Sequence, residues 1–289
     1  MNSSNNSSAG YSNVGGADLE LAIMTEIFHL RSLHWGHWEE GQELSLEGLR
    51  TAQENFTNKL AGLIPKDVKT VLDVGAGIGD VAMAMAKKGL EITSISPDPY
   101  HKNHFNEITK EFSNIKFVQS KYEDLDLDQK FDMVLMSESC GYFPIVEGLE
   151  QTLRYLKPNG YLIIACMFKT KEMKDSENYK YFHRLDDYLA EAKKRGLELT
   201  YDEDVTNQVT PSLDYTYHLY KDYFGPGLTL LAKHLKTDLG WKFKLVNFFF
   251  KRYINLIETT FTTTIPERLN SKLFKEYATY RFLIFKKQS

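Results

Sequence analysis

The sequence predicts an α/β protein built on a mostly parallel sheet, and three observations carry this prediction. Short apolar segments alternate with amphipathic helical segments from about residue 69 onward. A glycine-rich turn directly follows the first of the apolar segments. The chain has 289 residues, of which 42% are hydrophobic, so a full core needs no support from a metal or disulfides.

The N-terminal part divides into two predicted units. Residues 1–16 are mainly Ser, Asn and Gly and should form a disordered leader, because they offer little to bury. They lack the basic segment and apolar run of a secretory signal. Apolar positions at helical spacing predict two helices over 17–65, one from Asp18 and one that Pro65 ends. We expect both to cover the site described below.

A core of alternating strands and helices is expected over residues 66–205. Runs of β-branched and apolar residues mark the strands, and glycines or prolines separate them from the helices. We predict strands at 69–75, 91–96, 116–120, 131–139, 161–167 and within 196–206, and helices at 80–89, 99–112, 146–156 and 184–196. A last strand at 280–287 lies within a final unit of 278–289.

Residues 206–277 differ in character from the core and are predicted to form a helical lid with an aromatic inner face. From Thr206 onward there are 13 basic and 6 acidic residues, a net charge of +7 that leaves −11 for residues 1–205. The run FFFKRY at 248–253 fits a packed lid helix, the wall of an apolar acceptor pocket, or an edge that touches a membrane.

Composition excludes some classes of protein. The net charge is −4, and no run of about 18 apolar residues occurs, so neither a nucleic-acid-coating nor a transmembrane protein is indicated. The two cysteines, Cys140 and Cys166, fall at or inside strands and are interpreted as reduced thiols of a cytoplasmic protein. We expect no metal site, because His34 and His37 have no evident third ligand.

The turn after the first strand is the most informative motif. It places Gly75, Ala76, Gly77 and Gly79 between a buried strand and a helix rich in small residues, where a ligand can lie against the backbone. The third glycine comes one residue too early for a dinucleotide fingerprint. Asp73 precedes the turn, and its charge suits a cationic ligand such as S-adenosylmethionine better than a pyrophosphate.

With this motif and the later strands, the chain resembles a class I S-adenosylmethionine-dependent methyltransferase over about residues 30–205 and 278–287. The resemblance implies a Rossmann-like seven-stranded sheet with N-terminal helices and a lid inserted between strands six and seven. Within the family, the chain is most similar to the small-molecule branch of sterol, tocopherol, isoprenoid and ubiquinone-type enzymes. The segments SESCGYFP (137–144), HWGHW (34–38) and YDEDVTNQVTPSL (201–213) carry this similarity.

The resemblance also implies a set of cofactor-binding residues. Ser96 stands where an acidic residue commonly holds the ribose, and Asp98 could replace it. Lys121 stands where Asp is frequent, so Glu123 or Asp124 could bind the adenine amino group instead, with the Tyr122 backbone nearby. The full set expected to bind the cofactor is Trp35, Gly36, Asp73, Gly75, Ala76, Gly77, Gly79, Ser96, Pro97, Asp98, Tyr122, Glu123 and Ser137.

Three residues are candidates for catalysis. Glu138 ends an apolar strand, where a carboxylate is costly unless it faces a cation; its alternative role is to hydrogen-bond the cofactor or loop amides. His34 is a candidate acid, base or substrate contact. Tyr142 stands where the branch often has a histidine, and either presents its hydroxyl to the acceptor or packs on the cofactor.

The predicted function is methyl transfer from S-adenosylmethionine to a small, partly apolar or aromatic metabolite of isoprenoid, phenolic or natural-product type, with S-adenosylhomocysteine as product. Carbon is favoured as the methylated atom, and transfer to oxygen or nitrogen is the alternative. A nucleotide-dependent oxidoreductase and a non-catalytic S-adenosylmethionine-binding protein remain as other classes. The expected partner is a small-molecule acceptor, without nucleic acid and without stable membrane insertion, although peripheral membrane contact stays open.

Overall fold

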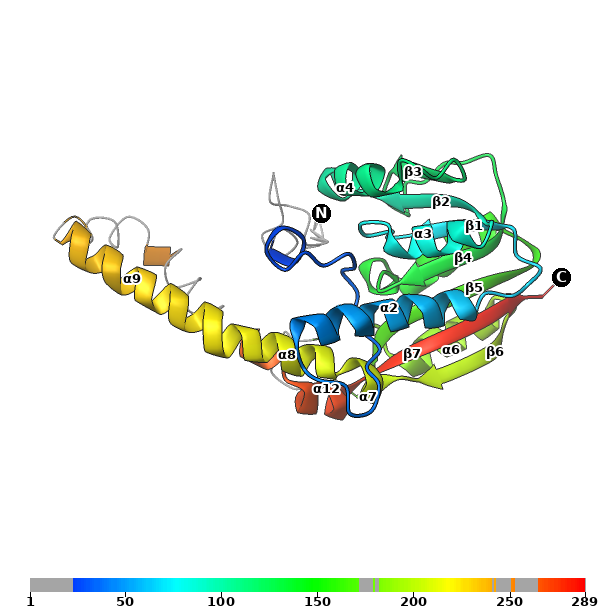
Figure 1. The fold of residues 1–289 in the computed structure, drawn as a ribbon. Coiled ribbons are helices and arrows are strands. Elements are labelled where there is room, and N and C mark those ends of the chain that lie inside the picture. Colours follow the sequence, from blue (N-terminus) through cyan, green and yellow to red (C-terminus); the bar gives the residue numbers. More distant parts are fainter. Residues whose placement is uncertain are drawn as a thin grey trace, which may run out of the picture.

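Seven strands form one mixed sheet, as the sequence predicts (Figure 1). The computed structural model describes residues 23–171, 179, 182–240, 242, 251–252 and 265–288. The strand order is β3-β2-β1-β4-β5-β7-β6. The strands are β1 (Thr70–Val74), β2 (Glu91–Ser96), β3 (Ile115–Gln119), β4 (Phe131–Ser137), β5 (Leu156–Lys169), β6 (Leu197–Asp204) and β7 (Ala278–Lys287).

The pairing of the strands fixes where a ligand can bind. Strands β1 to β5 pair with one another in parallel, whereas β7 lies antiparallel between β5 and β6. β1 pairs with β2 on one side and with β4 on the other, so the strand order reverses at β1. Ligands of open α/β sheets bind outside the carboxyl ends of the strands at such a reversal.

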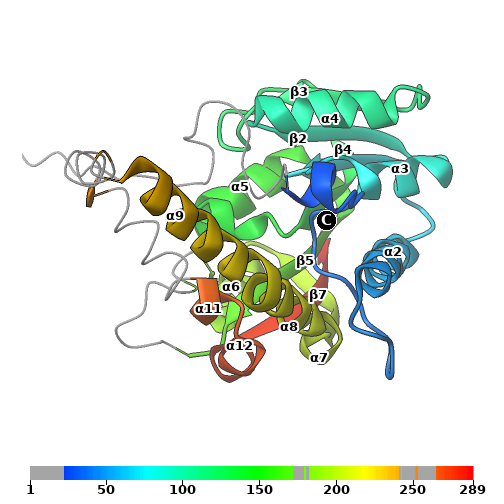
Figure 2. The same ribbon diagram turned by 60° about the vertical axis from the view of Figure 1, so that its left-hand side comes forward.

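Helices cover both faces of the sheet (Figures 1 and 2). α2, α3 and α4 contribute buried side chains to one hydrophobic cluster, and α5 and α6 contribute to the other. The helical elements are η2 (Ile23–Ile27), α2 (Leu46–Gly62), α3 (Asp80–Lys87), α4 (Pro99–Thr109), η3 (Cys140–Tyr142), α5 (Ile145–Tyr155), α6 (Leu185–Lys194), α7 (Thr206–Val209), α8 (Pro211–Leu219), η4 (Tyr220–Phe224), α9 (Gly225–Leu239), α11 (Ile265–Arg268) and α12 (Ser271–Tyr277).

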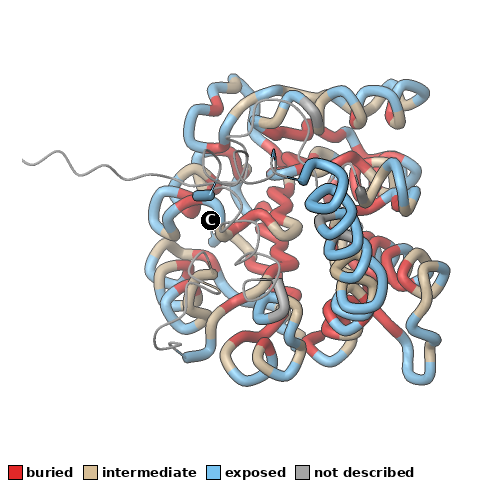
Figure 3. Tube along the Cα trace, turned by 90° about the vertical axis from the view of Figure 1, so that its left-hand side faces the viewer, coloured by how far each residue is buried: buried red, intermediate tan, exposed pale blue. Residues whose placement is uncertain are grey.

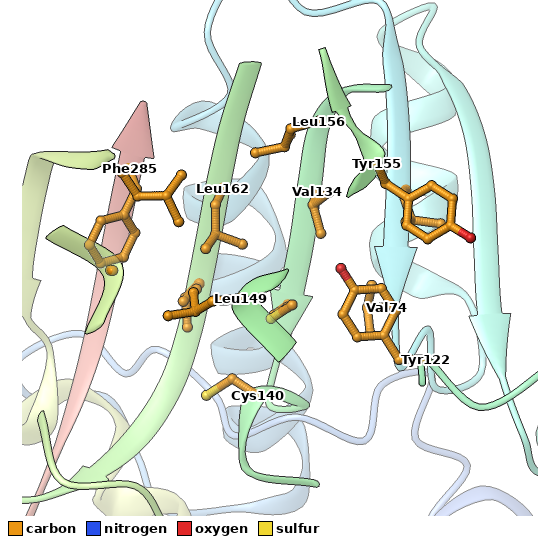
Figure 4. Packing of buried hydrophobic residues seen from close by; sticks show 14 of the residues in the cluster. Val74, Tyr122, Val134, Cys140, Leu149, Tyr155, Leu156, Leu162 and Phe285 are labelled. Carbon is orange, nitrogen blue, oxygen red and sulfur yellow. The ribbon is translucent and has the colours of Figure 1, made fainter. Parts of the chain in front are cut away.

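The central strands carry the core because both of their faces are covered. Val134 and Leu162 point to the α5 side, where they meet Leu149 of α5 (Figure 4). Cys140 and Cys166 belong to the same cluster, and both are buried and free. Figure 3 shows the buried residues gathered along the strands and the inner sides of the helices.

The largest differences from the sequence-based expectations are found in two elements. β5 begins at Leu156 rather than at 161, and its register against β4 shifts between Phe131 and Met133, with Asn159 at φ 59°. Pro158, Asn159 and Gly160 therefore form an irregularity inside the strand instead of a separate turn. The helix expected from Asp18 lies mostly outside the described residues, and the part that is described, η2, is a short π-helical turn.

The predicted lid region begins with α7 and α8, which pack near β7, and continues into α9, which extends away from the sheet (Figures 1 and 2). Tyr215 of α8 is buried, whereas Tyr223 is 65% exposed. Among the described residues, no helix has both the length and the apolar character needed to cross a bilayer. The leader 1–16 and several predicted lid residues lie outside the described residues: Trp241, Phe243, Phe248, Phe249, Phe250 and Tyr253.

Candidate functional site

The turn between β1 and α3 adopts the conformation that its glycines predict. Gly75, Gly77 and Gly79 have φ angles of 78°, 53° and 101°, which side-chain-bearing residues rarely adopt. A Cβ on Gly75 would lie 2.5 Å from Cβ of Ser139, and one on Gly79 would lie 2.8 Å from the Phe105 ring. These two glycines are therefore required by packing within the protein.

Gly77 differs from the other two glycines because nothing crowds it. The nearest atom to an added Cβ would be Cδ1 of Leu33 at 3.9 Å. Ala76, beside it, is buried, and its amide donates to the carbonyl of Ile95 at 3.1 Å. Gly77 is thus the glycine at which a ligand can approach the backbone.

Asp73 lies beneath this turn. Its side chain is buried and accepts a hydrogen bond of 2.9 Å from Oγ of Ser94 on β2. Burial raises the pKa of Asp73 to about 7, although the bond from Ser94 opposes the shift. The carboxyl group therefore changes charge near neutral pH, and it is not in direct contact with solvent.

The residues expected to bind the ribose follow β2, next to the glycine turn. Ser96 is buried, and its Oγ accepts a hydrogen bond from the amide of Asp98 at 3.3 Å. The same oxygen lies 3.3 Å from Nδ1 of His101. Pro97 is exposed and Asp98 is half-buried. Ser96 ends β2, so Ser96, Pro97 and Asp98 lie at the carboxyl edge of the sheet.

The next segment, after β3, places Tyr122 and Glu123 differently. The Tyr122 side chain is buried in the core, with its hydroxyl 3.0 Å from Oγ1 of Thr152 (Figure 4). Glu123 is exposed. Because the Tyr122 ring and hydroxyl are held inside the protein, only the backbone of this residue is available for adenine.

The end of β4 carries Ser137, Glu138 and Tyr142. Oγ of Ser137 is buried and has no hydrogen-bond partner among the described residues. Glu138 has a φ of 55°, a strained conformation for a residue with a side chain and one that is frequent at functional sites. Tyr142 lies on η3 and is 65% exposed.

Glu138 is held in place from two distant parts of the chain. Its Oε1 accepts hydrogen bonds from the amide of Trp35 at 3.0 Å and from the hydroxyl of Tyr280 on β7 at 2.9 Å. Burial raises the pKa of Glu138, whereas the nearby His34 side chain and these two donors oppose the rise. The result is a fixed carboxyl group with a raised pKa, which suits a proton acceptor near neutral pH.

A strap formed by residues 30–38 crosses this edge of the sheet and brings His34 to Asp80. Nε2 of His34 lies 2.9 Å from Oδ2 of Asp80, and Nδ1 lies 2.9 Å from the carbonyl oxygen of Trp35. Both oxygens are acceptors, so the imidazole fits this place as a doubly protonated cation. Burial lowers the pKa of His34, but Asp80 and Glu138 outweigh it, and the pKa is raised.

The strap is anchored further by packing on α2. Gly36 is buried, and an added Cβ would lie 2.5 Å from Cβ of Ala52. Its amide donates to Oγ of Ser212 at 2.9 Å. The Trp35 ring packs against Phe274, with ring centres 5.1 Å apart. The packing of the strap thus explains the glycine at position 36, and the Trp35 ring lies in an aromatic cluster.

That aromatic cluster joins the strap to the lid region. Its members come from the strap, from the segment after β5 and from α12, and Tyr179 stacks on Phe182 with ring centres 5.2 Å apart. Oη of Tyr179 has no hydrogen-bond partner among the described residues. Since Trp35 also donates to Glu138, the cluster lies beside the candidate carboxylate.

Sequence reasoning missed two of the groups that build this site. Asp80 was recognised only as the start of a helix, although it is the counterion of His34. Tyr280 was recognised only as part of a strand, and nothing in its neighbourhood in the sequence marks its hydroxyl as a partner of Glu138. The position of Asp80 directly after the glycine turn was the one feature of the sequence that could have marked it as a site residue.

Comparisons with known proteins identify the family of this chain. A family model described as a methyltransferase domain matches residues 46–201, more than half of the chain. The chain belongs to this methyltransferase family. The expected resemblance and the expected fold class are therefore confirmed.

Two curated relatives illustrate the family. A ubiquinone biosynthesis O-methyltransferase of Rickettsia akari (strain Hartford) is 32% identical over 105 residues, which are 35% of this chain and 41% of that protein. A 27-O-demethylrifamycin SV methyltransferase of Amycolatopsis mediterranei (strain S699) is 28% identical over 199 residues, 63% of this chain and 72% of that protein. The chain spans 36% to 56% of the length of three ubiquinone-pathway relatives from Rickettsia.

A solved structure shows the same fold over almost the whole chain. The geranyl diphosphate C-methyltransferase from Streptomyces coelicolor A3(2), in complex with Mg²⁺, geranyl diphosphate and S-adenosyl-L-homocysteine, superposes with a TM-score of 0.65. The match covers 96% of this chain and 94% of that one at 13% identity. The expected cofactor, S-adenosylmethionine, agrees with membership of the methyltransferase family.

Proposed function

We propose that this methyltransferase transfers a methyl group from S-adenosylmethionine to a small, partly apolar or aromatic metabolite. The observation that carries the proposal is the Glu138 carboxylate, which lies at the end of β4 beside the glycine turn of β1. Isoprenoid, phenolic and natural-product-like acceptors are the classes that fit, because the aromatic cluster with Trp35 adjoins this carboxylate.

The residues at the carboxyl edge fit the cofactor. Gly77 leaves its backbone accessible, and the buried Oγ of Ser137 has no partner among the described residues, so each can meet a ligand atom. Gly75, Ala76 and Gly79 shape the turn, Asp73 supplies negative charge below it, and Ser96, Pro97 and Asp98 lie where the ribose is expected. The backbone of Tyr122 and the exposed Glu123 are the groups proposed for adenine.

The chain's own residues would orient the acceptor and remove its proton. When bound, S-adenosylmethionine supplies an electrophilic methyl group, whose bond to sulfur breaks with its electron pair as the bond to the acceptor forms. Glu138 takes the proton that the acceptor loses, and the strap excludes water from the reacting atoms. His34 acts by charge and position, since both of its nitrogens are already bonded. Tyr142 is exposed and is proposed as an acceptor contact.

Carbon is the atom that we favour, because a ubiquinone/menaquinone relative and the geranyl diphosphate enzyme with the same fold are both named C-methyltransferases. Transfer to oxygen is the second candidate. The ubiquinone biosynthesis relative described above favours it, since that protein is named an O-methyltransferase. Glu138 would serve either reaction as the proton acceptor.

Parallel calorimetric titrations with S-adenosylmethionine, S-adenosylhomocysteine and NAD test the cofactor. We expect micromolar binding of the first two and none of NAD. A screen of isoprenoid, phenolic and amine acceptors with a labelled methyl donor then identifies the substrate class and the methylated atom. Binding of NAD alone would refute the proposal and indicate redox chemistry.

A further inference from the structure

Among the residues that the structure describes, hydrogen bonds reach only one oxygen of the Glu138 carboxylate. Oε1 accepts from the amide of Trp35 and from the hydroxyl of Tyr280. In the part of the chain that the structure describes, no hydrogen bond to Oε2 is found. The two donors therefore fix the rotation of the carboxyl group and leave one oxygen for another partner.

Tyr280 is rigidly placed to act as the second donor. It lies on β7, where its amide donates to Oγ1 of Thr206 at 2.9 Å and its carbonyl accepts from the amide of Val205 at 3.0 Å. Its ring is fully buried and contacts the rings of Trp35 and Phe56, with centres 5.9 and 6.0 Å away. The hydroxyl thus points to Glu138 with little freedom.

The hydroxyl proton has two acceptors within reach, and the geometry favours the carboxylate. The Glu138 oxygen lies 2.9 Å away, whereas the carbonyl oxygen of Ala165 lies 3.4 Å away. That carbonyl already accepts from the amide of Glu138 at 2.8 Å. A charged acceptor at the shorter distance forms the stronger bond.

The protonation states agree with this direction of donation. Burial and the neighbouring Glu138 raise the pKa of Tyr280 well above its ordinary value, so the phenol keeps its proton at working pH. The charged groups around Glu138 are His34 on the strap and Asp80 at the start of α3. Tyr280 is therefore a neutral donor and not a second base.

We propose that Tyr280 is a positioning residue for Glu138, holding Oε1 so that Oε2 is left to take the proton of the acceptor. This inference rests on the proposed function of Glu138. Because a hydrogen bond to a carboxylate stabilises the charged form, Tyr280 also keeps the proton affinity of Glu138 lower than burial alone would set it. Tyr280 on β7 thereby adjusts the proton affinity of Glu138, which directly follows β4.

The test measures Glu138 directly in the protein without cofactor. Glutamate labelled with ¹³C at the side-chain carboxyl gives a signal for each residue, and the signal lost in Glu138→Gln identifies the one of interest. In Tyr280→Phe we expect the midpoint of its titration to rise by about one pH unit. The acidic limb of the kcat profile should move upward by the same amount, while the cofactor dissociation constant stays within about twofold.

Two further variants separate the effect of the Tyr280 hydrogen bond from the effect of packing around its ring. Tyr155→Phe removes an equally buried hydroxyl, which donates to the carbonyl of Leu125 at the other end of the core, and should leave Glu138 unchanged. Replacing Tyr280 by 3-fluorotyrosine preserves the shape of the side chain and makes the phenol a better donor, so the titration should move downward. This variant keeps the test decisive even if Tyr280→Phe folds poorly.

An unchanged Glu138 titration in both Tyr280 variants would overturn the inference, whatever the turnover. Failure of the proposed function would look different. Full turnover by Glu138→Gln would remove Glu138 from the reaction, and this result is obtained without any change at Tyr280. The two failures are therefore distinguishable.

Discussion

His34 and Asp80 form a buried ion pair, with Nε2 and Oδ2 2.9 Å apart, that joins the N-terminal strap to the first turn of α3. Ser32 and Thr57 donate to the same carboxylate oxygen at 2.6 and 3.1 Å. Although burial opposes ionisation, these contacts lower the pKa of Asp80. The ion pair therefore holds the strap against α3 at the carboxyl edge of the sheet, where the cofactor is expected.

We predict that His34→Gln destabilises the fold by about 2 kcal/mol at pH 5.5. The folded pKa of His34 is raised above 6.5, so its stabilisation is complete below that pH and is lost as the pH rises through the folded pKa. Because the folded pKa of Asp80 is lowered, its charged form stabilises the fold at pH values above its ordinary pKa of 3.8. Urea unfolding at pH 5.5, 7 and 9 should show a difference from wild type that shrinks as the pH rises.

The exposed pair of His234 and Asp238 on α9 provides the control for this prediction. Its atoms are 3.2 Å apart, and both side chains are mostly exposed. His234→Gln should therefore change stability by less than about 0.5 kcal/mol. A difference for His34→Gln that stays constant from pH 5.5 to 9 would mean that His34 is not charged in the folded protein.

Gly77→Val should abolish binding of S-adenosylmethionine, because a branched side chain would occupy the open position on the turn. Gly89→Val is the matched control. Gly89 also has a positive φ, 82°, and nothing lies within 4 Å of an added Cβ, so it carries a similar backbone strain away from the turn. Calorimetry should detect the cofactor with Gly89→Val only. Equal affinity in both variants would place the cofactor elsewhere.

Glu138→Gln should lower kcat by about 10²- to 10⁴-fold, the usual contribution of a general base. Cofactor affinity should stay within a few-fold of wild type, because the amide oxygen can still accept from Trp35 and Tyr280. Single-turnover measurements with a labelled methyl donor separate the two effects. Wild-type turnover would exclude Glu138 as the proton acceptor.

Cofactor affinity should depend on pH through Asp73. The pKa of this carboxyl is raised to about 7, so protonation at lower pH removes a negative charge beneath the turn. We expect the dissociation constant of S-adenosylmethionine to rise as the pH falls from 8 to 6, approaching about tenfold per unit below the pKa. Asp73→Asn should bind weakly at every pH, and a pH dependence identical to wild type would contradict the prediction.

The charged form of Asp73, which favours cofactor binding, has the opposite effect on the stability of the fold. A carboxyl whose folded pKa is raised binds its proton more tightly in the folded state, so the fold loses stability as the pH rises from 3.8 to about 7. Asp73→Asn should therefore unfold at an equal or higher urea concentration than wild type at pH 8. A large loss of stability at that pH would instead show that the charged form is required for folding.

Gly36→Ala should loosen the strap, since the added methyl group would lie 2.5 Å from Cβ of Ala52. We expect a loss of about 1–3 kcal/mol in unfolding free energy, the usual cost of overpacking. Turnover should fall as well, because the neighbouring Trp35 amide holds Glu138. Gly62→Ala, at the end of α2 with nothing within 4 Å of the added group, serves as the control and should not destabilise.

The fold could be predicted from the sequence because each strand and turn is indicated by a short run of consecutive residues. The run from Val71 to Gly79 combines a buried strand with glycines in positive φ, and each later strand is an apolar segment between clear breaks. The start of β5 was predicted wrongly because Pro158, Asn159 and Gly160 resemble a turn, yet the pairing with β4 continues on both sides of them.

The site was only partly predictable because its contacts are not local. Glu138 was found from its place at a strand end, but its donors lie 103 and 142 residues away in the sequence. Tyr122 was expected near the cofactor through its backbone, and nothing in the sequence indicated that its hydroxyl lies 3.0 Å from Oγ1 of Thr152 on α5. The alternation of residues along a strand predicts the face of the sheet on which a side chain lies. It does not identify the residue that this side chain contacts.

The position of β7 also bears on the order in which the protein can fold during synthesis. Among the described strands, β6 pairs only with β7, and β7 begins at Ala278, long after β6 ends at Asp204. At usual ribosomal rates this interval takes roughly 4 to 15 seconds. During that time β6 is a strand without a neighbour and the β5 edge is open, so we expect nascent chains of this protein to depend on chaperones until the final strand emerges.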